Sequence, residues 1–120
     1  MLRIGPAGWD YRDWQGIVYP PRVAGTDRLT FLTQFFATIE INVTFYRPIT
    51  ATLARRWLEG VAGRPDFRFC AKLYRGFTHE RTTAPWPEET AVKAGLAELL
   101  AAGRLGALLA QFPYSFHNTE

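Results

Sequence analysis

The alternation of short apolar segments with amphipathic helical patterns constrains this chain more than any other feature of its sequence. Residues 38–46 and 67–74 alternate apolar and polar side chains with a period of two, as half-buried strands do. Residues 2–4 form a short apolar start, and residues 105–112 are apolar apart from Gln111, which is typical of a parallel strand buried on both faces. Because helical patterns separate these four segments, we expect right-handed β-α-β units and a parallel sheet.

Three helices are expected in the intervals between the strands, each with recognisable end signals. They cover residues 28–38 with Thr26 or Asp27 as the cap, about 50–61 opened by Thr50 or Thr52, and Glu88–Ala102 with Pro87 in the first turn and Gly103 after the end.

The polar face of residues 38–46 favours a barrel over an open, doubly wound sheet. Glu40 and Asn42 share one face of this strand, whereas a central strand of an open parallel sheet is normally covered by apolar helices on both faces. A face that looks into a barrel interior accommodates them better. An antiparallel strand with one face in water stays an alternative, against which the intervening helices argue. The expected fold is therefore α/β, a partial TIM-type (β/α) barrel with about four parallel strands and three helices in one domain, residues 1–120.

The composition is typical of one globular domain with a hydrophobic core. Of the 120 residues, 48% are hydrophobic, and the net charge of +3 comes from scattered groups whose longest basic run is Arg55–Arg56. That pattern does not favour nucleic-acid binding. The first residues contain no signal peptide or membrane span, so a cytoplasmic location is the expectation. Cys70, the single cysteine, is expected to be a core thiol.

Five segments carry motifs that occur together in one protein family. Residues 4–9 read I-G-P-A-G-W, 40–46 read E-I-N-V-T-F-Y, 67–72 read F-R-F-C-A-K, 78–80 read T-H-E, and 111–116 read Q-F-P-Y-S-F. In this order they resemble the family called domain of unknown function 72, or YecE-like. The resemblance implies a barrel of roughly 250 residues, of which this chain would be the N-terminal half, so we expect a truncated domain or fragment. The family brings no established reaction with it.

Three residues on or after the expected strands are candidates for catalysis. Glu40 could act as a general acid or base or as a metal ligand, or it could be a structural carboxylate held by Lys72 or an arginine. Lys72 could bind an anionic substrate, form a Schiff base, or only pair with Glu40. His79 follows the third strand, where it could shuttle a proton or bind a metal. No metal-binding spacing is present, so no metal site is assigned and the cofactor stays unknown.

Four further residues are candidates for ligand binding near the expected barrel mouth: Asn42, Tyr46, Trp9 and Gln111. Gln111 ends the expected fourth strand, where its amide could bind a ligand or a water in the barrel interior. Aromatic side chains such as Trp9 and Tyr46 offer stacking surface for a sugar or a base, although aromatic residues often only pack.

Two hypotheses of different classes follow. In the first, the parent family is enzymatic and uses an acid–base or metal site at the barrel mouth on an unknown small-molecule ligand. In the second, the chain is a non-catalytic half-barrel that assembles with a second copy or a partner chain, because a half-barrel leaves sheet edges unpaired and its inner face uncovered. Nucleic-acid binding through arginines and exposed aromatics is a third, weaker alternative.

Overall fold

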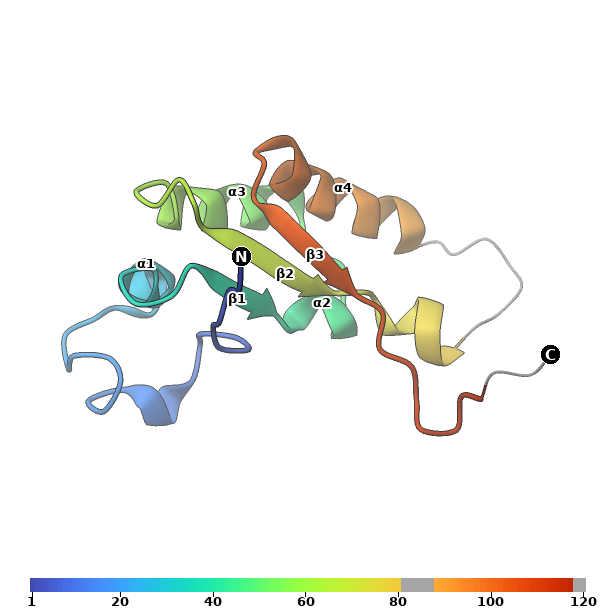
Figure 1. The fold of residues 1–120 in the computed structure, drawn as a ribbon, viewed down its shortest axis with the longest axis horizontal. Coiled ribbons are helices and arrows are strands. Elements are labelled where there is room, and N and C mark those ends of the chain that lie inside the picture. Colours follow the sequence, from blue (N-terminus) through green and yellow to red (C-terminus); the bar gives the residue numbers. More distant parts are fainter. Residues whose placement is uncertain (81–87, 118–120) are drawn as a thin grey trace.

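The structure, a computed structural model, describes residues 1–80 and 88–117 and contains a parallel sheet of three strands in that part of the chain (Figure 1). Its strands β1 (Thr38–Ile41), β2 (Arg68–Lys72) and β3 (Leu105–Leu109) lie in the order β1-β2-β3, and both neighbouring pairs are parallel. The prediction of an α/β fold with a parallel sheet is confirmed. The described residues form three strands where four were expected.

The N-terminal segment pairs with β1 at a different place from the one predicted. Residues 2–4 form no strand, and Leu2 and Ile4 are exposed. A parallel bridge instead joins Ala7 to Glu40, with the Gly8 amide 2.8 Å from the Glu40 carbonyl oxygen. The chain therefore reaches the sheet a few residues later than its apolar start suggests, and it lies beside β1 at the edge opposite β3.

The described residues form four α-helices and shorter helical turns, which precede β1 or connect successive strands. The α-helices are α1 (Arg28–Leu32), α2 (Val43–Tyr46), α3 (Ala51–Gly60) and α4 (Glu88–Ala101), and the turns are η1 (Arg12–Trp14), η2 (Gly25–Asp27) and the π-helical turn η3 (Gly76–Glu80).

The end signals of the helices are largely where the sequence places them. Thr50 caps α3, because its hydroxyl accepts a hydrogen bond from the Leu53 amide at 3.1 Å. Gly103, with φ of +65°, follows the end of α4. Asp27 lies at the N-cap of α1, which ends earlier than expected. Pro87 and the side chain of Thr26 lie outside the described part of the chain.

The strand expected over residues 38–46 is half as long as its alternating pattern suggests. It ends at Ile41, and the following residues coil into α2. Local hydrogen bonds replace the ladder there: the Thr44 hydroxyl donates to the Ile41 carbonyl at 3.0 Å, and the Phe45 amide donates to the Asn42 carbonyl at 3.1 Å. A period-two pattern therefore continued past the end of the strand into a short helix.

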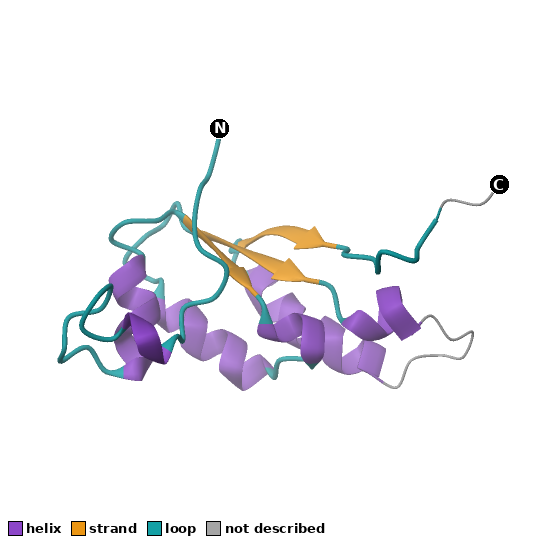
Figure 2. Ribbon diagram, turned by 90° about the horizontal axis from the view of Figure 1, so that it is seen from below, coloured by secondary structure: helices purple, strands orange, loops and turns teal. Residues whose placement is uncertain are grey.

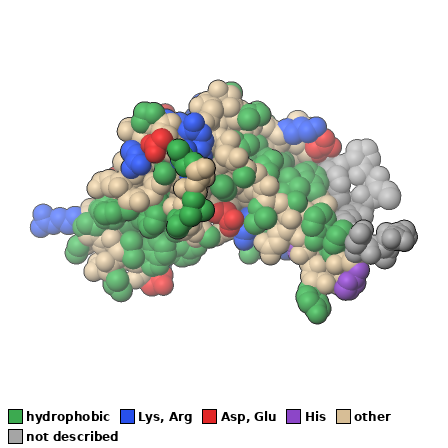
Figure 3. Space-filling view, in the orientation of Figure 1, with side chains coloured by type: hydrophobic (Ala, Val, Ile, Leu, Met, Phe, Trp, Pro, Cys, Tyr) green, Lys and Arg blue, Asp and Glu red, His purple; other side chains and the backbone are tan. Residues whose placement is uncertain are grey.

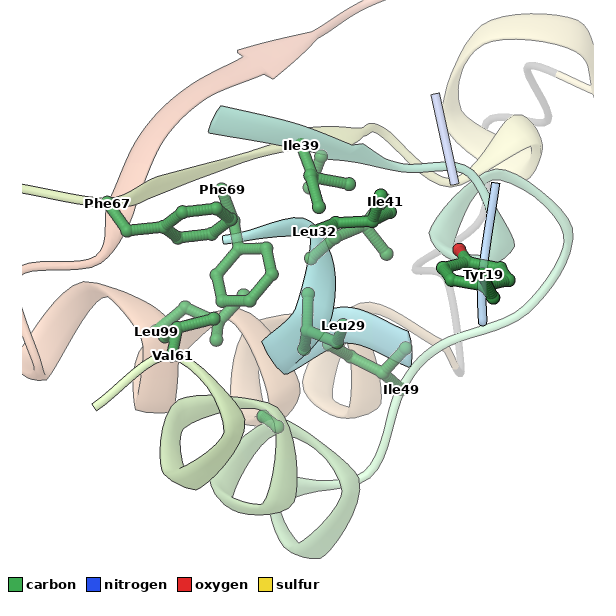
Figure 4. Packing of buried hydrophobic residues seen from close by; sticks show 12 residues of the cluster. Tyr19, Leu29, Leu32, Ile39, Ile41, Ile49, Val61, Phe67, Phe69 and Leu99 are labelled. Atoms are coloured by element: carbon green, nitrogen blue, oxygen red, sulfur yellow. The ribbon is translucent and has the colours of Figure 1, made fainter. Parts of the chain in front are cut away.

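All helices of the described chain lie on one side of the sheet (Figure 2). The core fills the space between the two layers: Phe69 and Ile39 point from the sheet toward Leu99, Val61, Leu29 and Leu32 of the helical layer (Figure 4). Phe67 and Phe69 pack edge to face, with ring centroids 5.1 Å apart. The opposite side of the sheet carries no helix among the described residues, and we call it the helix-free face.

Strand β3 is exposed, which corrects the expectation of a strand buried on both faces. Leu105 is half-buried, whereas Leu108 is 48% exposed and Leu109 is 44% exposed. The reason is its position at the edge of the sheet, where no described strand pairs with its outer side. The strand also ends at Leu109, so the segment to Phe112 is not part of it.

Candidate functional site

Glu40 and Lys72 form an ion pair on the helix-free face. The Lys72 Nζ lies 3.6 Å from Glu40 Oε1. The side chain of Lys72 is 24% exposed and that of Glu40 is 26% exposed. The register of the two strands explains the contact: Glu40 lies opposite Cys70, and Lys72 is two residues farther along the same face of β2. The structure thus brings together the two residues that the sequence placed on neighbouring polar faces.

The surroundings of this pair are small or apolar. Cys70 lies 3.7 Å from the Thr38 hydroxyl, and in β3 Ala107 and Leu109 lie opposite Cys70 and Lys72. Figure 3 looks onto this face and shows acidic and basic side chains side by side near its middle, amid apolar and uncharged surface. Cys70 is half-buried and free, so the expectation of a core thiol is wrong. Cys70 and Lys72 are two residues apart in β2, and alternate residues of a strand point to the same face, so Cys70 also lies on the helix-free face.

His79 lies in η3, beyond the carboxyl end of β2. Its Nδ1 is 2.8 Å from the Thr78 hydroxyl, and its ring packs edge to face on Phe45 of α2 at a centroid distance of 5.1 Å. Thr78 is buried, so this contact fixes the imidazole orientation. Within residues 1–80 and 88–117, no hydrogen bond or ion pair joins His79 to Glu40.

Asn42 and Tyr46 lie in the segment that follows β1. Asn42 is at the N-cap of α2 without capping it, and its buried Oδ1 accepts no hydrogen bond from the described residues. Tyr46 is exposed and packs edge to face on Phe45 at 5.1 Å. Both residues are therefore near the carboxyl end of the sheet, where parallel α/β folds bind ligands.

Trp9 and Gln111 are not part of the group around Glu40. Trp9 is half-buried on the helix side, with its ring 5.1 Å from Trp57 of α3 and 6.3 Å from Phe69. Tyr19 holds this loop, since its hydroxyl donates to the Trp9 carbonyl at 2.5 Å, and burial raises the pKa of Tyr19. Gln111 is exposed two residues beyond the end of β3, so the expectation that it ends the strand is wrong.

Two hollows beside Trp9 were not foreseen from the sequence. One of about 370 Å³ involves Asn42 and Arg47, and one of about 530 Å³ lies between α1 and α3. Arg47 and Trp57 carried no motif that marked them as site residues. The alternation of the preceding segment placed residue 47 just past a strand, whereas α2 turns it toward the first hollow.

Metal-ligating side chains do not cluster in the part of the chain that the structure describes, where no group of three His, Cys, Asp or Glu residues is close enough to hold an ion. Over the same residues, no helix is both long and apolar enough to cross a membrane. The polar side chains described on the helix-free face include the Glu40 carboxylate, the Lys72 ammonium group, the Cys70 thiol, the Thr38 hydroxyl and the Arg68 guanidinium.

Comparison with known proteins places the chain in a family. The profile of the family described as "Protein of unknown function DUF72" matches residues 3–120. This chain belongs to the DUF72 family. The UPF0759 protein YunF of Bacillus subtilis (strain 168) is 30% identical over 118 residues, which are 94% of this chain and 40% of that protein. The family resemblance of the sequence motifs is confirmed.

Solved DUF72 structures share the fold of this chain. A DUF72 protein of Thermotoga maritima superposes with a TM-score of 0.76 at 27% identity, covering 99% of this chain and 47% of that one. A DUF72 protein of Enterococcus faecalis gives a TM-score of 0.76 at 24% identity, covering all of this chain and 42% of that one, and it shows the fold alone. The DUF72 chain described here thus spans less than half the length of these relatives.

Proposed function

We propose that this DUF72 chain provides one half of a (β/α) barrel and that its helix-free face lines a ligand-binding, acid–base site in the barrel interior. The observation that carries the proposal is the Glu40–Lys72 pair, which is half-buried on the side of the sheet opposite the helices. In β/α barrels, that side of the sheet is the interior, and functional groups gather toward its carboxyl end. The relatives, more than twice as long, have enough additional chain for the remaining strands.

The geometry of the pair leaves both groups able to bind a ligand. The separation of 3.6 Å exceeds the roughly 2.7–2.9 Å of a charge-assisted hydrogen bond, so the two groups attract without being locked together. Lys72 can donate to an anionic oxygen, and the Glu40 carboxylate can accept a proton or a hydrogen bond from the same molecule. These capacities suit proton transfer next to a carboxylate or phosphate of a substrate.

The remaining candidates have supporting roles in this proposal. His79, oriented by Thr78, is a proton shuttle at the carboxyl end of the sheet, and Tyr46 is a ligand-binding group of the same end. Asn42 lines a hollow on the helix side and has no role in this proposal. Trp9 and Gln111 lie away from the pair and carry no role in it.

Ligand-detected NMR with a panel of small carboxylates and phosphates tests the proposal. We expect binding by the wild-type protein to weaken about tenfold, the loss of one charged hydrogen bond, in Lys72→Met. Lys93→Met is the matched control, because Lys93 pairs with Glu89 on the exposed surface of α4. Equal binding by the wild type and Lys72→Met, or no binding of any panel member, contradicts the proposal.

The exposed edge favours a second candidate function, that of a non-catalytic half-barrel that assembles with a second copy of this chain. Leu108 and Leu109 are exposed on the unpaired edge strand, and beyond it the exposed ring of Phe112 stacks on Phe116 at 4.4 Å. Burying these side chains against a symmetry-related edge would remove apolar surface from water and satisfy unpaired backbone groups.

Sedimentation velocity over a wide concentration range tests assembly. The expected result is a dimer that Leu108→Lys converts to a monomer, because a charge on the edge opposes strand pairing. Ile17→Lys alters a more exposed apolar residue of the N-terminal loop and should leave the dimer intact. A monomer at every concentration rules out self-assembly.

A further inference from the structure

A hollow of about 370 Å³ lies on the helix side of the sheet, apart from the Glu40–Lys72 pair. Its floor is Ile41, a core residue of β1, which places it on the side opposite the helix-free face. The N-terminal loop from Gly8 to Tyr11, the start of α2 and helix α3 form its walls. Its volume is within the range of small-molecule sites, and it lies at the carboxyl end of parallel strands, where such sites are found.

Two tryptophans give the hollow flat apolar walls. Trp9 and Trp57 lie edge to face, with ring centroids 5.1 Å apart and planes at 87°. The loop that carries Trp9 is held by the hydrogen bond from Tyr19, and Trp57 belongs to the regular helix α3. Preformed aromatic walls of this kind accept a ring, either aromatic or sugar, by stacking.

The side chain of Asn42 lies beside the hollow, and its oxygen receives no hydrogen bond from the described residues. Its Oδ1 is buried and has no hydrogen-bond partner among the described residues, although the residue lines the hollow. Because this oxygen is closed to solvent, a molecule in the hollow cannot reach it without a turn of the side chain, so we assign it no contact with a ligand.

The charges around the hollow favour an anion. Asp10 is already neutralised by Arg28, whose Nη1 lies 2.5 Å from its carboxylate. Arg47, which is exposed, makes no ion pair with any residue in 1–80 or 88–117. Its guanidinium is therefore available to a carboxylate or phosphate, which it can bind through two parallel hydrogen bonds.

We propose that this hollow binds a small organic anion built on a ring. The ring lies against Trp9 and Trp57, and the carboxylate or phosphate meets Arg47. The site is separate from the helix-free face and does not depend on the function proposed for Glu40 and Lys72.

Tryptophan fluorescence and calorimetric titrations with para-hydroxybenzoate, benzoate, phenyl phosphate, glucuronate and neutral phenol test the site. We expect at least one ring anion to bind and phenol to bind at least about tenfold more weakly, since it lacks the charge. The aromatic and sugar anions distinguish the two kinds of ring.

Variants separate loss of binding at this site from loss of the fold. Arg47→Met should weaken the binding of the anion about tenfold, whereas Arg22→Met, an exposed arginine that lines neither hollow, should leave it unchanged. Near-ultraviolet circular dichroism verifies that each variant is folded. No binding of any ring anion, or equal binding by the wild type and Arg47→Met, overturns the proposal.

Discussion

Removing the charges of Glu40 and Lys72, singly and together, perturbs the helix-free face most directly. Their charged atoms are 3.6 Å apart, and each side chain is about a quarter exposed. At this distance two unit charges attract by about 1 kcal/mol in bulk water and by about 5 kcal/mol at an effective dielectric constant of about 20. Desolvation and lost side-chain freedom oppose the attraction. We therefore expect a net coupling of about 1 kcal/mol, near the upper end of values for exposed pairs.

A double-mutant cycle in urea measures this coupling. The variants are Glu40→Gln, Lys72→Met and the double variant, and the double variant should lose about 1 kcal/mol less stability than the two single losses combined. Sodium chloride at about 1 M should reduce the coupling by more than half, since the screening length falls to about 3 Å. The Arg55–Glu98 pair, whose side chains are 54% and 31% exposed, is the control, with an expected coupling of about 0.5 kcal/mol or less.

The outcome that refutes this reasoning is a Glu40–Lys72 coupling no larger than that of the control pair. A coupling that does not respond to salt would also refute it, because the contact would then not be electrostatic.

Four other variants have expected outcomes. Asn42→Leu should raise the free energy of unfolding by about 1 kcal/mol in urea, because it removes a buried acceptor that lacks a partner, and a loss of stability would mean that the amide is satisfied. Gly95→Ala should cost about 2 kcal/mol despite the better helix propensity of alanine, since its Cβ would lie 2.2 Å from the Ile49 carbonyl oxygen. Ala94→Gly, on the exposed side of α4, should cost only about 1 kcal/mol, and equal losses would contradict the close packing. For Tyr19, burial raises the pKa above its ordinary value of 10.0, so the unfolded chain loses its proton first and stability declines as the pH rises above that value. The decline should be smaller in Tyr19→Phe, and an identical alkaline profile would contradict the assignment.

Local signals in the sequence were sufficient for α3, α4 and the parallel pairing of β1 with β2. Thr50 and Gly103 marked the start of α3 and the end of α4, because capping depends on neighbouring backbone groups. Two consecutive strands joined through a helix implied parallel pairing, which placed Glu40 beside Lys72. These features depend on contacts close in sequence or on general rules of connection.

Features set by tertiary contacts were not accessible in the same way. The alternation through Phe45 fitted a strand, yet side-chain and backbone hydrogen bonds turned the segment into α2. The apolar character of β3 indicated burial, but exposure depends on neighbours, which the described chain lacks at that edge. The hollow at Trp9 and Arg47 joins three segments distant in sequence, so no local pattern could reveal it.

The reactivity of Cys70 tests the central claim that the described residues leave one face of the sheet free of helices. As the only cysteine in the sequence, it is a specific probe, and it lies opposite Glu40 and two residues before Lys72 on that face. In dilute native protein we predict complete modification by a small thiol reagent at a rate that does not change with low concentrations of denaturant. Modification that occurs only as the protein unfolds would show that Cys70 is in the core and would contradict the account.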